Sequence, residues 1–487
     1  MTGRNTYLKN FLWRTAEHVG ARGVSFLVSI VLARLLMPTD YGEIAIVLVL
    51  INLLSIFVDS GFGAALIQKK DADEIDFSSV FYFNLVICIV LYLALFILAP
   101  AIAKAYKMEH LTSVIRVQSL LLVISGVKSI QTAYVARHMV FKRFFFATLG
   151  GTIGAALIGI LMAYKGFGVW ALVAQSLFNN CLDTIILWFT VKWRPTASFS
   201  LKRLRDLFSY GGKLLLGTML DKVYWEARQL IIGGVYTTAD LAFFNRGALF
   251  PNEVEHTITG GLGDILFPAM SKIQHDPEQV KKWVKQVNLT HSYFLLPFMF
   301  GLAAIAESLT VVLFTEKWLP SVPYLRMFCM MYLFSSISLT NTNAAKALGH
   351  SEVWMRINFL RAPIHLMGLL LTIRWGVMAV AISSVCTTLI GELICAWSSE
   401  KLIDYSLLMQ IRDILPHIAM SALMALCVWS ISLLGWSAPL TLIVQIAVGM
   451  LIYWGLSALF RVKTYHYVLS NIKTIIKSKK EKKHGSL

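Results

Sequence analysis

The sequence predicts an all-α membrane protein, on two observations. Of its 487 residues, 57% are hydrophobic and only 15% are charged, whereas about a quarter of the residues in an average soluble protein are charged. The apolar residues also gather in runs of about 20, the length that an α-helix needs to cross the hydrocarbon core of a bilayer. These observations predict a chain that crosses a membrane many times.

Fourteen apolar segments are candidates for membrane-spanning helices. Short connections separate them, and the seventh and eighth are interrupted by polar residues. In chain order the segments are 11–34, 41–62, 80–103, 114–136, 146–164, 168–191, 207–235, 242–267, 289–314, 324–347, 354–373, 376–399, 414–435 and 439–460.

The basic residues are distributed unevenly between the two sides of the membrane. With the N-terminus in the cytoplasm, the cytoplasmic segments hold 29 Lys and Arg residues, the opposite side holds 8, and 7 lie within spans. This bias predicts that both termini are cytoplasmic. It also accounts for the net charge of +17 without a nucleic-acid partner. The basic tail, 464–487, is expected to contact the headgroups of anionic membrane lipids.

The connections are too short to hold a soluble active site. The longest, 270–288, is expected to be a helical cytoplasmic loop. Gly212-Lys213 lacks the earlier glycine and the following Ser or Thr of a phosphate-binding P-loop. The eleven histidines and six cysteines show no zinc-binding spacing. We therefore expect no catalytic residue, no metal and no cofactor, and a function carried out among the helices rather than an enzyme.

Several cations lie within the predicted spans. A charge at mid-bilayer costs about 2.5–3.5 kcal/mol on insertion scales, so such a residue usually faces a wet cavity or a partner. Arg22, Lys128 and Arg361 have no opposite charge within one helical turn. This favours binding of an external anion, and structural pairing with a distant residue is the alternative.

Two further cations are candidates for the same role. Lys222 lies four residues before Glu226, so the two share a helix face and form either a self-neutralised pair or part of a substrate site. Arg246 begins the eighth span, five residues before Pro251. A proline there frees a backbone carbonyl and bends the helix, which suits a cavity that changes shape.

The fifth span carries a face of small residues. Gly150 and Gly154 are four residues apart, as are Ala155 and Gly159. Small residues at this spacing allow the backbones of two membrane helices to approach closely. We interpret this face as a packing surface.

Five segments together resemble the Wzx-type polysaccharide flippases, nearest the colanic-acid and teichuronic-acid exporters. These belong to the superfamily that also holds drug/cation antiporters and the peptidoglycan lipid flippase. The resemblance covers residues 10 to about 401. The segments are Leu32-Ala-Arg-Leu-Leu-Met-Pro-Thr-Asp-Tyr-Gly42, Asp59-Ser-Gly-Phe-Gly-Ala-Ala-Leu-Ile-Gln68, Phe243-Phe-Asn-Arg246, Leu266-Phe-Pro-Ala-Met-Ser271 and Glu316-Lys-Trp-Leu-Pro-Ser-Val-Pro323.

The resemblance implies a fold of two six-helix lobes around a central cavity. We expect the lobes over 1–195 and 196–405, followed by two additional transmembrane helices over 406–463 and the cytoplasmic tail. The implied cargo is an oligosaccharide repeat on undecaprenyl diphosphate, moved from the cytoplasmic to the periplasmic leaflet of the bacterial inner membrane. Such a flippase serves exopolysaccharide or lipopolysaccharide biosynthesis, and a polysaccharide polymerase and a chain-length regulator are candidate partners.

The expected mechanism is alternating access, with cations contacting the diphosphate. Asp59, Glu307 and Glu392 are candidates for coupling to protons or sodium. Two other functions stay open at this point. A cation-coupled multidrug exporter would need an acid-dominated cavity, and a membrane-embedded polysaccharide polymerase usually carries a long outer loop; this sequence predicts neither feature.

Overall fold

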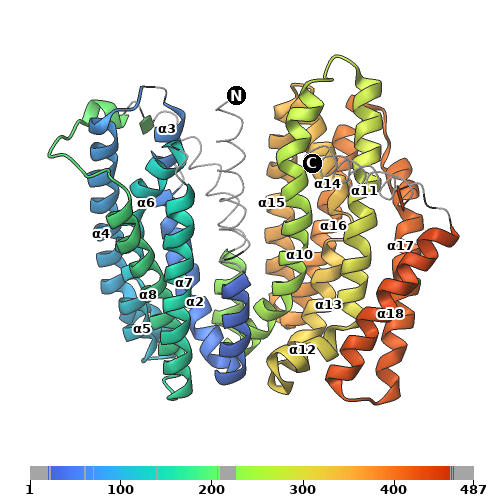
Figure 1. The fold of residues 1–487 in the computed structure, drawn as a ribbon, viewed down its shortest axis with the longest axis horizontal. Helices are drawn as coiled ribbons and strands as arrows, with labels where there is room; N and C mark the ends of the chain where they lie inside the picture. The colour runs from blue at the N-terminus through green and yellow to red at the C-terminus, as the bar shows by residue number, and fades with distance from the viewer. Residues whose placement is uncertain are drawn as a thin grey trace, which may run out of the picture. The chain divides into compact units, whose positions relative to one another are not determined.

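The computed structural model describes residues 20, 23–59, 62–69, 71–138, 141–205, 207–208, 226–460, 462 and 464–465. Among these residues every regular element is a helix, which confirms the predicted all-α class (Figure 1). The chain divides into two compact units, Met1–Ala242 and Phe243–Leu487. The lobe boundary that we placed at 195–196 stays a prediction.

The described part of the first unit is mostly helical, with the irregular segment 191–200 after its last long helix. The segment Gly23–Leu35 is helical and apolar. It is followed by α2 (Pro38–Asp59), α3 (Phe62–Gln68), α4 (Glu74–Ala105), α5 (Leu111–Gln118), α6 (Leu120–His138), α7 (Phe141–Tyr164) and α8 (Val169–Thr190).

The second unit begins within α10 (Thr238–Ser271). It continues through α11 (Pro277–Ala304), α12 (Ala306–Phe314), η1 (Glu316–Ser321), α13 (Val322–Met331), α14 (Ser335–Ala347), α15 (Ser351–Thr372), η2 (Ile373–Trp375), α16 (Val377–Ile403), α17 (Leu407–Ser430), η3 (Ile431–Leu434) and α18 (Ala438–Leu459).

The described helices match the predicted spans. Nine helical segments are long and apolar enough to cross a membrane, and Gly23–Leu35 and Thr148–Tyr164 are shorter apolar helices. Helices α10 and α15 cover the predicted eighth and eleventh spans, and most of the seventh lies outside the described residues. Large apolar side chains such as Ile97 and Phe189 are 73% and 83% exposed, as expected where lipid replaces water.

The small-residue face of α7 packs against α8. A Cβ atom on Gly154 would lie 3.0 Å from Leu182 Cδ2, and one on Gly159 would lie 3.0 Å from Gln175 Cβ. These distances leave no room for a larger residue, so the prediction of a packing surface is confirmed.

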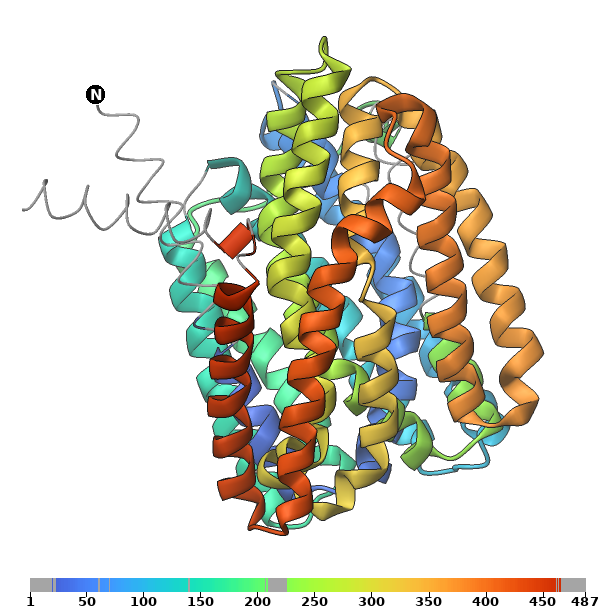
Figure 2. The ribbon, with the colours of Figure 1, turned by 90° about the vertical axis from the view of Figure 1, so that its right-hand side faces the viewer.

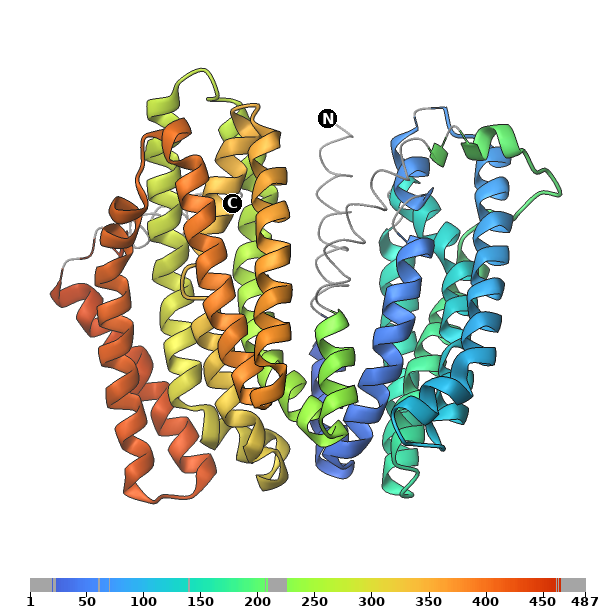
Figure 3. The ribbon, with the colours of Figure 1, turned by 180° about the vertical axis from the view of Figure 1, so that it is seen from behind.

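The interior of the second unit is partly polar. Helix α17 packs against both α11 and α18 (Figure 2), and α15 runs beside α16 (Figure 3). Between α14 and α17, Asn341 Nδ2 donates to Gln410 Oε1 at 2.8 Å. Between α11 and α14, the hydroxyls of Ser292 and Ser336 are 3.0 Å apart. Such hydrogen bonds hold membrane helices together where hydrocarbon offers no other partner.

Candidate functional site

The guanidinium of Arg361 lies at the junction of α14, α15 and α16. Its Nε and Nη2 atoms donate to the carbonyl of Gly391 at 3.0 and 2.7 Å. Nη2 also donates to Ser338 Oγ at 3.0 Å and lies 3.6 Å from Glu392 Oε1. We call these four residues the Arg361 cluster.

The Arg361 cluster is largely buried. The side chains of Arg361 and Glu392 are 21% and 10% exposed. The position of the Arg361 side chain depends on Gly391, because a Cβ atom there would lie 2.8 Å from Arg361 Nε. Glu392 Oε2 has no hydrogen-bond partner among the residues described. The cluster therefore has an ion pair with unused acceptor capacity in a low-dielectric environment.

A second ion pair joins α6 and α8 in the first unit. Lys128 Nζ contacts Asp183 Oδ2, and the two side chains are 23% and 7% exposed. A lysine within a span is thus neutralised by an acid 55 positions away. Lys128 and Arg361 therefore each have an acid partner that is distant in the sequence. Such pairing was the alternative to binding of an external anion.

Arg246 has aromatic neighbours. Its guanidinium carbon lies 4.6 Å from the ring centroids of both Phe314 and Trp318, and the residue is 8% exposed. Cation–π contacts of this kind stabilise a buried guanidinium. Trp318 belongs to the segment Glu316–Pro323 that carried the family resemblance, which gives that segment a physical role.

The three candidate coupling acids differ in their surroundings. Glu392 belongs to the Arg361 cluster. Glu307 accepts from Arg326 Nη2 at 2.9 Å and is more exposed, with side-chain exposures of 56% for Glu307 and 33% for Arg326. Asp59 ends α2, but its side chain is outside the described part of the chain.

Two of the predicted cations cannot be placed. Arg22 and Lys222 lie outside the described residues. Glu226, which we considered as a partner of Lys222, accepts from Asn52 Nδ2 at 3.3 Å and from Gln229 Nε2 at 3.2 Å. Its environment in the first unit is therefore polar, whatever the position of the lysine.

Sequence reasoning identified the cations but not the residues around them. Ser338 and Gly391 contribute a hydroxyl and a carbonyl to Arg361, and neither had a signal in the sequence. Asp183 was visible as an acid within a span, yet its distance from Lys128 along the chain concealed the pair. Within the described part of the chain, no three His, Cys, Asp or Glu side chains are placed to hold a metal ion.

The fold and these in-span charges define a class: a multi-pass, all-α membrane protein. The solved structure of the lipid II flippase MurJ, in an inward closed conformation, superposes with a TM-score of 0.73 at 15% identity, covering 92% of this chain and 98% of that one. An inward-facing multidrug resistance MATE family transporter of the MOP superfamily gives a TM-score of 0.61 at 14% identity, with 78% and 94% covered.

The chain belongs to the family of polysaccharide biosynthesis proteins, whose profile matches residues 31–323. It is 26% identical over 329 residues to the succinoglycan biosynthesis transport protein ExoT of Rhizobium meliloti, covering 67% of this chain and 66% of that protein. It is 23% identical to the teichuronic acid biosynthesis protein TuaB of Bacillus subtilis, with 82% and 84% covered. The predicted family is thereby confirmed.

Proposed function

We propose that this protein is a flippase for a lipid-linked oligosaccharide. The cargo is a sugar repeat on undecaprenyl diphosphate, moved by alternating access from the cytoplasmic to the periplasmic leaflet of the bacterial inner membrane. The observation that carries the proposal is the largely buried guanidinium of Arg361 inside a chain of the polysaccharide biosynthesis family. A buried cation suits an anionic cargo.

The comparisons support the transport step. ExoT is named as a transport protein of succinoglycan biosynthesis. WzxC of Escherichia coli, 22% identical over 373 residues, is named as a lipopolysaccharide biosynthesis protein. MurJ, which has a similar fold, is named as a lipid II flippase. These names fit a cargo in which a sugar is carried on a lipid.

The chemistry of recognition follows from the cations. Arginine binds phosphate through parallel hydrogen bonds. For Arg361 to bind the diphosphate, it must exchange its bonds to Gly391 and Ser338 for bonds to phosphate oxygens. Arg246, whose guanidinium contacts two aromatic rings, and Lys128 are the other described candidates, and Arg22 and Lys222 complete the proposed set.

Two features of the proposal bear on the energy source for transport: the negative charge of the cargo and the candidate coupling acids. An inside-negative potential favours outward movement of an anion by about 2.3 kcal/mol per charge per 100 mV. Glu392 is the strongest candidate for proton coupling, because neutralising it would release Arg361 to the cargo. Glu307 and Asp59 are the remaining candidates.

The function is tested with purified protein in liposomes. A fluorescent undecaprenyl-diphosphate oligosaccharide is placed in one leaflet, and its appearance in the other is followed with a membrane-impermeant quencher. We expect protein-dependent translocation that Arg361→Ala reduces at matched protein amounts. The assay is run with both a membrane potential and a pH gradient across the liposome membrane. Absence of translocation under these conditions would contradict the proposal.

The same liposomes distinguish the alternatives. Energised efflux of a cationic dye without movement of the lipid-linked sugar would favour a multidrug exporter. A change in the length of the saccharide would indicate a polymerase. In cells, fusions of a cytoplasm-dependent reporter to each terminus test the proposed orientation, and co-purification tests whether a polymerase or chain-length regulator is a partner.

A further inference from the structure

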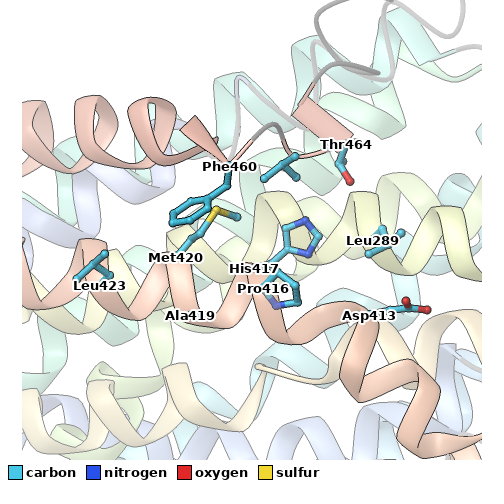
Figure 4. Close-up of a pocket in the computed structure, with 10 residues that line it drawn as sticks. Leu289, Asp413, Pro416, His417, Ala419, Met420, Leu423, Phe460 and Thr464 are labelled. Atoms are coloured by element: carbon cyan, nitrogen blue, oxygen red, sulfur yellow. The ribbon is translucent and has the colours of Figure 1, made fainter. Parts of the chain in front are cut away.

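A cavity of about 560 Å³ lies between α11, α17 and the end of α18 in the second unit (Figure 4). Ligand sites in proteins typically measure about 300–1,000 Å³. Its lining is mostly apolar and includes Leu289, Met420, Leu423 and Phe460. None of the charged residues assigned to cargo or ion coupling lies in this lining, so the cavity is separate from the sites discussed above.

One lining residue is a buried imidazole without a partner. His417 is 3% exposed, and neither ring nitrogen has a hydrogen-bond partner within the described structure. Its ring meets that of Tyr293 edge-on, with centroids 5.7 Å apart, and Figure 4 shows it in the middle of the lining. A buried polar group left unsatisfied is costly, so an occupant that hydrogen-bonds to it is favoured.

Charged groups lie at one end of the cavity. Asp413, one helical turn before His417, is 2.8 Å from Lys285 Nζ and accepts from the hydroxyl of Tyr405 at 2.5 Å. From Asp413 the lining continues along α17 to Leu423, a distance of about 15 Å at 1.5 Å per residue. Along α17 the order is therefore an acid paired with Lys285 of α11, a hydrogen-bonding imidazole and then an apolar surface.

We propose that this cavity holds one glycerophospholipid of the bilayer. Its headgroup lies at Asp413 and Lys285, an ester carbonyl accepts a hydrogen bond from His417, and an acyl chain extends along α17 toward Leu423. A zwitterionic headgroup matches a pair of opposite charges. A polyprenyl chain fits less well, because an isoprenoid has no polar group to meet the imidazole.

Lipid retention by the purified full-length chain tests the proposal. After detergent washing, native mass spectrometry counts the bound phosphatidylethanolamine. We expect one retained lipid in the wild type and about a tenfold weaker affinity in His417→Phe, since one hydrogen bond to a buried group is worth about that factor. His417→Gln, which keeps a donor, should restore retention. His350→Phe removes an exposed imidazole of the same unit and should leave retention unchanged.

A second comparison uses only the wild-type chain, so it is decisive even if His417→Phe fails to fold. A diether analogue of phosphatidylethanolamine lacks the ester carbonyls and should bind about tenfold more weakly. Equal binding of the ester and ether lipids would overturn the proposal. Two other results would also overturn it. One is lipid retention in folded His417→Phe that equals retention in the wild type. The other is a polyprenyl phosphate that displaces phosphatidylethanolamine in a His417-dependent way.

Discussion

Replacing Arg361 by Met removes the cation from the Arg361 cluster and leaves Glu392 buried without its partner. Breaking a buried ion pair from one side costs about 3–5 kcal/mol. The 3.6 Å separation and the partial exposure of both side chains favour the lower end, about 3 kcal/mol. For a unit of this size, that corresponds to a fall in Tm of roughly 6–12 °C. The double variant Arg361→Met/Glu392→Met removes both charges and should recover most of this loss.

The double variant separates stability from transport. If Arg361 binds the diphosphate, surface polysaccharide stays low in both variants even though the double variant is stable. Thermal unfolding of the purified protein and surface polysaccharide at matched protein levels are the two measurements. Arg326→Met, which breaks the more exposed pair with Glu307, controls for loss of an ion pair and should cost less than about 1 kcal/mol.

Two results would contradict this role of Arg361. Normal export in the double variant would show that Arg361 serves only to neutralise Glu392. A single Arg361→Met variant as stable as Arg326→Met would show that the buried pair contributes no more than an exposed one.

Three further predictions concern the first unit. Lys128→Met leaves Asp183 buried without its cation and should destabilise the protein by about 3 kcal/mol, measured by thermal unfolding. Gly154→Leu forces α7 away from α8 and should cost about 1–3 kcal/mol in the same assay. Hydrogen bonds from the backbone three residues later and from Arg203 lower the pKa of Asp73 from its ordinary value of 3.8. Its stabilising contribution should be constant at neutral pH and disappear below about pH 4, measured as the difference in Tm from Asp73→Asn across pH.

Matched variants provide the controls. Lys165→Met removes an exposed lysine and should be neutral, so equal effects at Lys128 and Lys165 would contradict the buried pair. Gly455 has no atom within 4 Å of an added Cβ, and Gly455→Leu should be tolerated where Gly154→Leu is not. Glu74→Gln tests whether any acid at the start of α4 gives the pH dependence; an identical profile would contradict the role of Asp73.

Part of the candidate site was predictable because membrane burial makes charge conspicuous. Lys128, Arg246 and Arg361 stand out in apolar segments, and each lies in a helix that the structure contains. Their partners could not be predicted, since Asp183 and Glu392 are each 30 or more positions away from the cation they meet. Periodicity relates residues only within one helix, and pairing between helices depends on how the helices pack.

The all-α class, the spans and the packing face on α7 were predictable from the sequence. Their signals are segment length, hydropathy and the spacing of small residues, and each of these is a property of a single helix. Tertiary structure decided which charges are neutralised and where a cavity remains. Gly391 admits the guanidinium of Arg361, two rings contact Arg246, and His417 is left facing an apolar cavity. Each of these depends on distances between helices, which no single segment encodes.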